Sequence, residues 1–331
     1  MPKIVGIGGK MMTGKTSVAR YLSILYGGEV ISIAGSLKGV SLYRLGILSF
    51  YPQKHNETRR NLQYYASLGR EIDPEMWVQT IIPFIVNLGD DEFVFIPDIR
   101  YLNEIQFLTN IFGKDNCLFL YLLTPLVERE VPKDILEHES ERLSPTLFDA
   151  VIPEKDFEGK VVSCVSAIKT KWGIDPTPRK PKLYIGTNIN FSSEFARVFY
   201  TLQELLEREG YEVCNPEEEF GASDWNEWVE VKSLDEASQL LVTEDLTSLN
   251  EVDGGVFYFT SPSIGGSMEV FALSLQGKPV IIGVPLTLFY HPWLRFFGKV
   301  VWEHDTTYFP ILIMTTKKYI PPVGQILSKL Q

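Results

Sequence analysis

The sequence predicts an α/β protein with two three-layer domains, each with helices on both sides of a mostly parallel sheet. Its 331 residues are enough for two domains, each with its own core. Apolar strand-like segments alternate with helix-like segments, a pattern typical of right-handed crossovers between parallel strands. A stretch with three prolines, residues 175–182, separates two such alternations. We therefore expect a first domain over residues 1–174, a stiff linker over 175–182 and a second domain over 183–331.

Strands and helices are expected from the start of the first half. The expected strands are 3–8, 29–33, 93–96 and 117–123, and the expected helices are 16–25, 56–67, 74–87 and one that begins at Leu102. The strand at 93–96 is wholly apolar, as a parallel strand covered on both faces has to be. The first half therefore has the pattern of a complete α/β domain.

The second half starts the same pattern again after the linker. Its expected strands are 182–186, 211–214, 255–259 and 279–284, and its expected helices are 194–209, 235–249 and 267–276. The first of these helices has apolar residues at helical spacing, namely Phe195, Val198, Phe199, Leu202, Leu205 and Leu206. A second, separately folded α/β domain follows from this repetition.

Composition and charge exclude several classes of protein. Hydrophobic residues make up 45% and charged residues 22%, which argues against a disordered, collagenous or disulfide-based chain. Lys and Arg number 31 against 42 Asp and Glu, a net charge of −11 with no basic stripe, which argues against nucleic-acid binding. No apolar run is long enough for a membrane span, and a strand at the start leaves no room for a signal peptide. With three scattered cysteines, these features predict a cytoplasmic protein.

A phosphate loop is predicted at residues 9–16, Gly-Lys-Met-Met-Thr-Gly-Lys-Thr, which match the pattern GxxxxGK[ST]. Gly9 and Gly14 allow backbone N–H groups to turn toward phosphates, and the N-terminus of the following helix favours negative charge. Lys15 would reach the β- and γ-phosphates and act in catalysis, and Thr16 would offer its hydroxyl to Mg²⁺. The motif therefore predicts a nucleoside triphosphate site.

Other charged residues of the first half are candidates for the same site. Asp98 ends an apolar strand and could bind Mg²⁺ or its water, or could instead cap the next helix. The guanidinium groups of Arg59, Arg60 and Arg70 suit phosphate, although arginines on a helix can also form a solvated face. The charge-dense segment 128–142 lies where a mobile lid would exclude water in a kinase.

Several separated motifs give the first half a family resemblance over about residues 3–170. They are the phosphate loop, 32–38, 59–63 with 69–70, 73–77, 97–104 and 138–141, in that order. With these motifs the chain resembles the deoxynucleoside monophosphate kinases of large phages and their P-loop relatives. The resemblance implies a P-loop kinase fold, ATP and Mg²⁺ as the donor and a deoxynucleoside 5′-monophosphate (dNMP) as the acceptor.

The resemblance also implies roles for single residues. Lys15, Thr16 and Asp98 would act on the donor and the metal. The residues implied to hold phosphates are Arg59, Arg60, Arg70 and Arg100. The loop interior, Lys10-Met-Met12, departs from the small residues of the family and could narrow the choice of donor.

Two carboxylates of the second half are candidates for a glycosidic site. Residues 260–269 form a small-residue loop between a strand and a helix, where an anion or a sugar would bind. Glu269 is expected in the first turn of that helix and Asp245 on the preceding helix. If they converge, one could attack C1′ of a nucleotide while the other protonates the departing base, as in retaining glycosidases. Spacing alone favours the alternative, a helix-terminal charge at Glu269 and a surface residue at Asp245.

The second half also has motifs of a known superfamily, at residues 183–186, 244–246, 262–269 and 277–280. Here the chain resembles the nucleoside 2-deoxyribosyltransferases and, most closely, the 2′-deoxynucleoside 5′-monophosphate N-hydrolases. The resemblance implies a flavodoxin-like fold. It makes Glu269 the nucleophile, Asp245 the general acid/base and Tyr184 a sugar-site residue.

The residue six positions before the nucleophile separates the two branches of this superfamily. The transferases have Asp there, which would repel a 5′-phosphate, whereas this chain has Ser263, whose hydroxyl can accept one with the N–H groups of Gly265 and Gly266. The Arg-rich loop of the hydrolases is missing, and only Asn188, Asn190 and Arg197 are candidates in its place. The sequence therefore favours monophosphates as substrates and water as the final acceptor.

The family usually completes its site from a neighbouring subunit, which implies a homo-oligomer through the C-terminal domain. The aromatic segment 289–297 is a candidate interface, with ordinary core as the alternative.

Together the two resemblances imply a bifunctional enzyme that acts on small nucleotides, without nucleic acid or membrane as partners. One domain would phosphorylate a dNMP, and the other would hydrolyse a dNMP to base and deoxyribose 5-phosphate through Glu269. Two alternatives for the second domain stay open, a base-exchanging deoxyribosyltransferase and a non-catalytic nucleotide sensor. The pairing makes physical sense if the two sites prefer different bases, as in a phage-encoded enzyme that remodels the nucleotide pool of the host cytoplasm.

Overall fold

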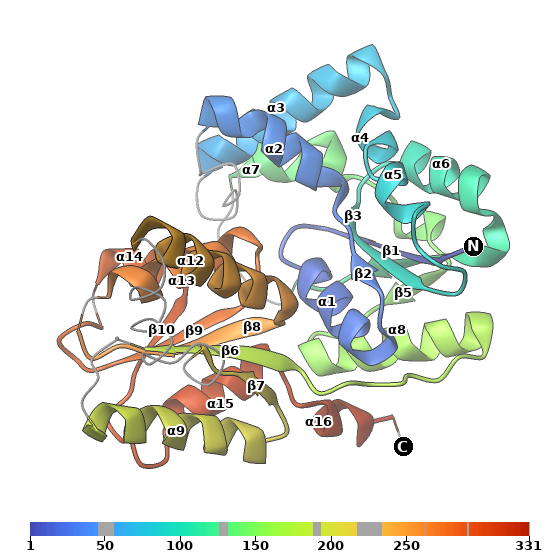
Figure 1. Cartoon of the computed structure of the whole chain (residues 1–331). Helices are drawn as coiled ribbons and strands as arrows, with labels where there is room; N and C mark the ends of the chain where they lie inside the picture. The colour runs from blue at the N-terminus through green and yellow to red at the C-terminus, as the bar shows by residue number, and fades with distance from the viewer. Residues whose placement is uncertain are drawn as a thin grey trace. The chain divides into compact units, whose positions relative to one another are not determined.

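The computed structural model describes residues 1–45, 56–125, 132–187, 193–216, 234–261, 263–289 and 291–330. It contains two five-stranded sheets in which all paired strands are parallel, which confirms the predicted α/β fold class (Figure 1). The chain divides into two compact units, Met1–Arg179 with the C-terminal segment from Lys329, and Lys180–Ser328. The division falls within the proline-containing segment 175–182.

The sheet of the first unit has the strand order β2-β3-β1-β4-β5. Its strands are β1 Lys3–Gly9, β2 Glu29–Val30, β3 Phe93–Ile99, β4 Cys117–Leu122 and β5 Ala150–Ile152. The helices are α1 Lys15–Tyr26, α2 Ile33–Leu45, α3 Asn56–Ile72, α4 Met76–Gln79, α5 Ile82–Ile85, α6 Leu102–Phe112, α7 Lys133–Leu136 and α8 Phe157–Trp172. Helices α1 and α8 cover one face of the sheet and α6 covers the other (Figure 1). Because β1 is the buried central strand, the loop after it opens at the carboxyl edge of the sheet.

Two elements of the first unit differ from the prediction. The strand expected at 29–33 ends at Val30, because α2 begins at Ile33 with its first N–H groups bound to the Asp98 carboxylate. The helix expected at 74–87 is two short helices, because Pro83 has no backbone N–H and fits only the first turn of a new helix.

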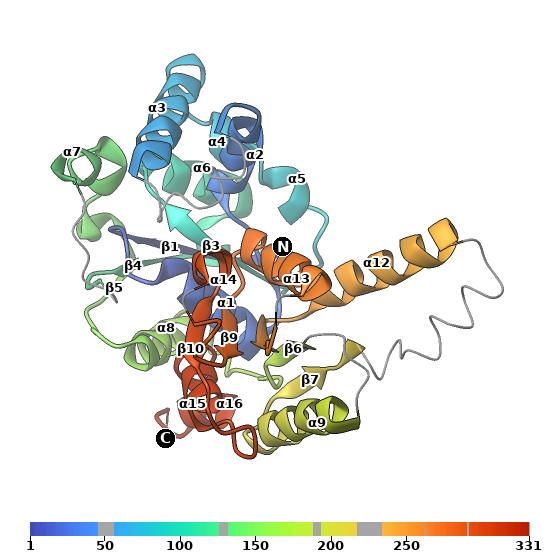
Figure 2. The same cartoon turned by 90° about the vertical axis from the view of Figure 1, so that its left-hand side faces the viewer.

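The sheet of the second unit has the order β10-β9-β8-β6-β7. Its strands are β6 Lys182–Thr187, β7 Glu212–Cys214, β8 Gly254–Tyr258, β9 Val280–Val284 and β10 Lys299–Trp302. The helices are α9 Ser193–Arg208, α12 Leu234–Glu251, α13 Ile264–Leu275, α14 Pro292–Phe297, α15 Pro310–Tyr319 and α16 Val323–Leu327. Helices α9 and α15 cover one face, and α12 to α14 cover the other, with α12 and α13 side by side (Figure 1, Figure 2).

Each face of this sheet has its own apolar core, and β6 contributes to both in alternation. Leu183 and Ile185 pack toward α9 and α15, whereas Tyr184 packs toward α12 to α14. This alternation decides which side chains of β6 can meet the carboxylates of α12 and α13. Among the described helices, none combines the length and the apolar character that a membrane span requires.

Candidate active sites

The loop between β1 and α1 has three residues with positive φ, Gly9 at 135°, Met12 at 64° and Gly14 at 86°. A Cβ atom at Gly9 would lie 2.5 Å from the Leu122 carbonyl oxygen, so only glycine fits there. Met12 is not glycine, and its conformation stores strain that the surroundings must offset. The backbone of the predicted phosphate loop is therefore tightly specified.

Lys15, at the start of α1, is buried, and its Nζ donates hydrogen bonds to the carbonyl oxygens of Gly9 at 2.8 Å and Lys10 at 2.6 Å. Burial lowers the pKa of Lys15 well below its usual value, and the positive charge of Arg100 lowers it further, with a smaller effect from Arg59. The carboxylates of Glu141 and Asp98 act in the opposite direction, so the ammonium group is held within the loop among charges of both signs.

A second lysine, Lys38 of α2, shares the neighbours Asp98 and Arg59 with Lys15, in a chain whose net charge is −11. Burial lowers the pKa of Lys38 too. The Asp98 carboxylate raises this pKa, whereas the positive charges of Arg20 and Arg59 lower it. Cations that disfavour one another in a buried place are stabilised by an anion with several charges. The motif that contains Lys38 was visible in the sequence, but only the fold shows that this side chain lies near Asp98 and Arg59.

Asp98 binds the start of α2, not the start of the next helix along the chain. Its carboxylate accepts hydrogen bonds from Ser32 Oγ at 2.6 Å and from the N–H groups of Ile33 at 3.0 Å and Ala34 at 2.7 Å. Asp98 therefore does cap a helix, but this helix is α2 and not the helix that follows Asp98 in the chain. Since both carboxylate oxygens are already in use, a contact of Asp98 with Mg²⁺ through water fits better than a direct bond.

Thr16 is exposed on the first turn of α1, where its hydroxyl could bind a metal ion. In the described parts of the chain, no group of three or more His, Cys, Asp or Glu side chains could hold a metal. A site with one or two protein oxygens suits Mg²⁺, which takes its other ligands from phosphates and water. The residues present therefore fit a metal that arrives with a nucleotide.

The four predicted phosphate-binding arginines occupy different places. Arg100 and Arg59 lie close enough to Lys15 to lower its pKa. Arg70 lies 3.8 Å over the ring of Tyr101, and its buried Nη1 has no hydrogen-bond partner among the described residues. Arg60 instead forms an exposed ion pair with Asp134 at 2.6 Å. An unpaired buried donor is costly, so the place of Arg70 is suited to an anionic partner.

In the second unit, the strand period of two puts Tyr184 and Gly186 on the face that α12 and α13 cover. Tyr184 is fully buried there. A Cβ atom at Gly186 would lie 3.0 Å from Glu269 Oε2 and 2.4 Å from the Phe257 ring. Glycine at this position therefore lets the Glu269 carboxylate approach the end of the strand.

Glu269 is in the second turn of α13, not in the first turn as expected. The helix begins at Ile264, because Ser263 is its N-cap and accepts a hydrogen bond from the Gly266 N–H at 3.2 Å. Glu269 is therefore too far along the helix to serve as a charge at its N-terminus, which removes that alternative explanation.

Asp245, Glu269 and Tyr184 lie near one another, with Tyr184 fully buried and the two carboxyl residues partly buried. Burial, and after it the neighbouring Asp245 carboxylate, raise the pKa of Glu269 to about 8, and burial raises the pKa of Asp245 to about 6. Burial and then the two carboxylates raise the pKa of the Tyr184 hydroxyl well above its usual value. The Tyr184 hydroxyl makes no well-aligned hydrogen bond with the described residues. It is nevertheless close enough to Glu269 to lower the pKa of the Glu269 carboxyl group. Near neutral pH the carboxyl pair therefore holds about one proton.

The predicted phosphate ligands of the second unit are less well gathered. The Gly266 N–H is engaged by the helix cap, and Gly265 is exposed with open space around it. Arg197 is exposed on α9, which covers the opposite face of the sheet, and Asn188 and Asn190 lie outside the described residues. The Ser263 hydroxyl keeps its own proton for a ligand, because toward Gly266 it acts as acceptor.

In the aromatic segment 289–297, Phe289 and Phe297 pack on the core and Leu294 is buried. Pro292 and Arg295 of the same segment are exposed, so the segment contributes to the core of its own unit and also reaches the surface.

A scan against models of protein families finds no match for this chain, and a search of curated proteins finds none either. The two family resemblances therefore rest on the sequence motifs.

Proposed function

We propose that the chain is a bifunctional enzyme of deoxynucleotide metabolism, with ATP-dependent dNMP kinase activity in the first unit and dNMP N-glycosidase activity in the second. The single observation that carries the second activity is the partly buried Asp245–Glu269 pair beside Tyr184. The kinase activity of the first unit is supported by the strained loop around buried Lys15 and by the nearby cations Arg59 and Arg100.

In the first unit, the loop N–H groups and Lys15 would bind the β- and γ-phosphates of ATP. Thr16, with Asp98 acting through water, would hold Mg²⁺, which when bound neutralises phosphate charge. Arg59 and Arg100 would stabilise the charge on the phosphoryl group as it passes between the nucleotides. The unpaired Nη1 of Arg70 supports a role in holding the acceptor phosphate.

In the second unit, the Glu269 carboxylate would attack C1′ while Asp245 gives its proton to the departing base. Asp245, now ionised, would take a proton from water, and the resulting hydroxide equivalent would displace Glu269 and release deoxyribose 5-phosphate. Tyr184 would orient Glu269. Because Glu269 has the higher pKa, the shared proton is on Glu269 before a nucleotide binds, so binding has to move it to Asp245.

Base release is expected to have a bell-shaped pH dependence with a maximum near pH 7. Below about pH 6 both carboxyls are protonated and none can attack, and above about pH 8 both are ionised and no proton is left for the base. The measurement is kcat/KM for base release between pH 4 and pH 10, since it reports the free enzyme. A profile that is flat from pH 5 to pH 9 would contradict the shared proton.

The direct test of the proposal is incubation of the full chain with each dNMP in turn, with and without ATP and Mg²⁺. We expect a diphosphate only when ATP is present. Free base and deoxyribose 5-phosphate should form even when ATP is absent. Addition of a different free base separates the alternatives, because an exchanged nucleotide indicates a transferase. A chain that binds nucleotides in the second unit without releasing base would be a sensor.

A further inference from the structure

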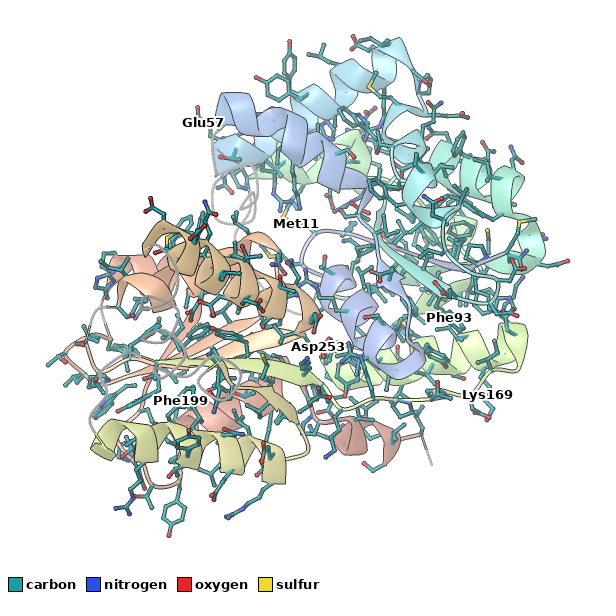
Figure 3. All side chains as sticks on the ribbon, in the orientation of Figure 1. Met11, Glu57, Phe93, Lys169, Phe199 and Asp253 are labelled. Atoms are coloured by element: carbon teal, nitrogen blue, oxygen red, sulfur yellow. The ribbon has the colours of Figure 1, made fainter. Side chains whose placement is uncertain are left out.

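The motif at 138–141 has no role in the mechanism above, yet its last residue lies against the phosphate loop. The Glu141 side chain is only 3% exposed. Its Oε2 accepts a hydrogen bond from the N–H of Met11 at 2.8 Å, and its Oε1 accepts one from Arg100 Nη1, also at 2.8 Å (Met11 is labelled in Figure 3). One buried carboxylate thus joins a loop amide to a predicted phosphate-binding arginine.

A buried cation contacts the same loop through a carbonyl group. Lys160 of α8 is fully buried, and its Nζ donates hydrogen bonds to the carbonyl oxygens of Thr13, at 2.9 Å, and Thr124. Glu141 therefore binds a loop donor and Lys160 binds a loop acceptor, on either side of the strained Met12. Neither residue is near the loop in sequence.

Buried charges are expensive, and a neutral side chain could satisfy one amide or one carbonyl at lower cost. Charged groups, however, form stronger hydrogen bonds and hold a strained backbone more firmly. Their opposite signs also leave the loop with little added net charge, so the cations around Lys15 still define an anion site. A purely stabilising role does not explain why both charges converge on this loop.

The hydrogen bonds of Arg100 show how Glu141 holds one side of its guanidinium group. Besides Glu141, its Nη1 faces the carbonyl oxygens of Gly9 and Ser140, both at 3.3 Å. Its Nε and Nη2 make no hydrogen bond with the described residues. One nitrogen of the guanidinium is thus anchored, and the others remain for a phosphate.

We propose that Glu141 and Lys160 are positioning residues for phosphoryl transfer, with Lys160 fixing the loop shape that binds ATP and Glu141 fixing Arg100 to that loop. This proposal rests on the kinase function proposed for the first unit. The proposal predicts that loss of each residue affects a different step of the kinase reaction. Loss of Lys160 weakens ATP binding, whereas loss of Glu141 mainly slows the transfer step.

The test compares Glu141→Gln and Lys160→Met in the full chain, with kcat and KM for ATP from diphosphate formation and with Kd for ATP from calorimetry. We expect Lys160→Met to raise Kd about tenfold and Glu141→Gln to lower kcat roughly 100-fold with KM changed less than about threefold. Matched controls are the exposed Glu137→Gln and Lys155→Met, which should behave like the wild type. Glu141→Asp and Lys160→Arg keep the charges and should recover part of the loss.

Amide hydrogen exchange without nucleotide gives a readout that does not depend on activity. Faster exchange of residues 9–15 in Glu141→Gln and Lys160→Met, at unchanged thermal unfolding of the chain, supports the proposal. Variants with wild-type kinetics and exchange overturn it. So does a fall in unfolding temperature with no separate change in kcat or Kd. A wild type that binds no ATP overturns the kinase proposal instead, while the exchange data still decide whether the two residues hold the loop.

Discussion

Replacing Glu269 with glutamine is expected to reduce base release roughly 10⁴-fold, because the amide cannot form the bond to C1′ that the mechanism requires. Diphosphate formation should be unchanged, since the kinase residues belong to the other unit. The chain should stay folded, because at neutral pH the buried Glu269 is largely uncharged and the amide has nearly the same shape. The measurement is the rate of free base production from each dNMP, with thermal unfolding recorded for the same sample.

Two further variants separate catalysis from packing in this site. Asp245→Asn should slow base release strongly, whereas Glu251→Gln, an exposed change on the same helix, should leave it unchanged. If Glu269→Gln releases base at the wild-type rate, the carboxylate is not the nucleophile and the mechanism proposed for the second unit is wrong.

Replacing Lys15 with methionine is expected to reduce diphosphate formation roughly 10³-fold, because it removes the buried ammonium group that donates hydrogen bonds to the loop carbonyls. Methionine keeps much of the length of the lysine side chain, so the loop keeps its packing. The substitution also removes a buried cation whose pKa burial lowers, so the unfolding temperature should not fall. The measurement is ATP-dependent diphosphate formation with the best dNMP at saturating ATP.

The second activity of the same chain serves as the internal control for this variant. Base release should continue at the wild-type rate in Lys15→Met, and Lys155→Met, an exposed lysine of the same unit, should change neither activity. Wild-type diphosphate formation by Lys15→Met would contradict the assignment of residues 9–16 as the ATP site.

Local patterns predicted most of the strands and helices because periodicity and turn residues act over a few positions. The strand at 93–96 was visible from its apolar run, and the helix from Leu102 was expected at its observed start. The predicted boundaries were wrong where a residue far along the chain contacts the end of an element. Asp98, far along the chain, binds the start of α2 and so ends the strand that was expected to reach Ile33.

The sequence by itself determined the alternation of strands and helices, the division into two α/β halves and the spacing of the phosphate-loop motif. These depend on neighbouring residues, and local physics acts on them directly. Only the tertiary structure decided that Asp245 and Glu269 lie beside the buried Tyr184, and that Glu141 and Lys160 form hydrogen bonds with the loop. The physical reason is that burial and charge interactions depend on distance in space, which parallel crossovers set between residues far apart in the chain.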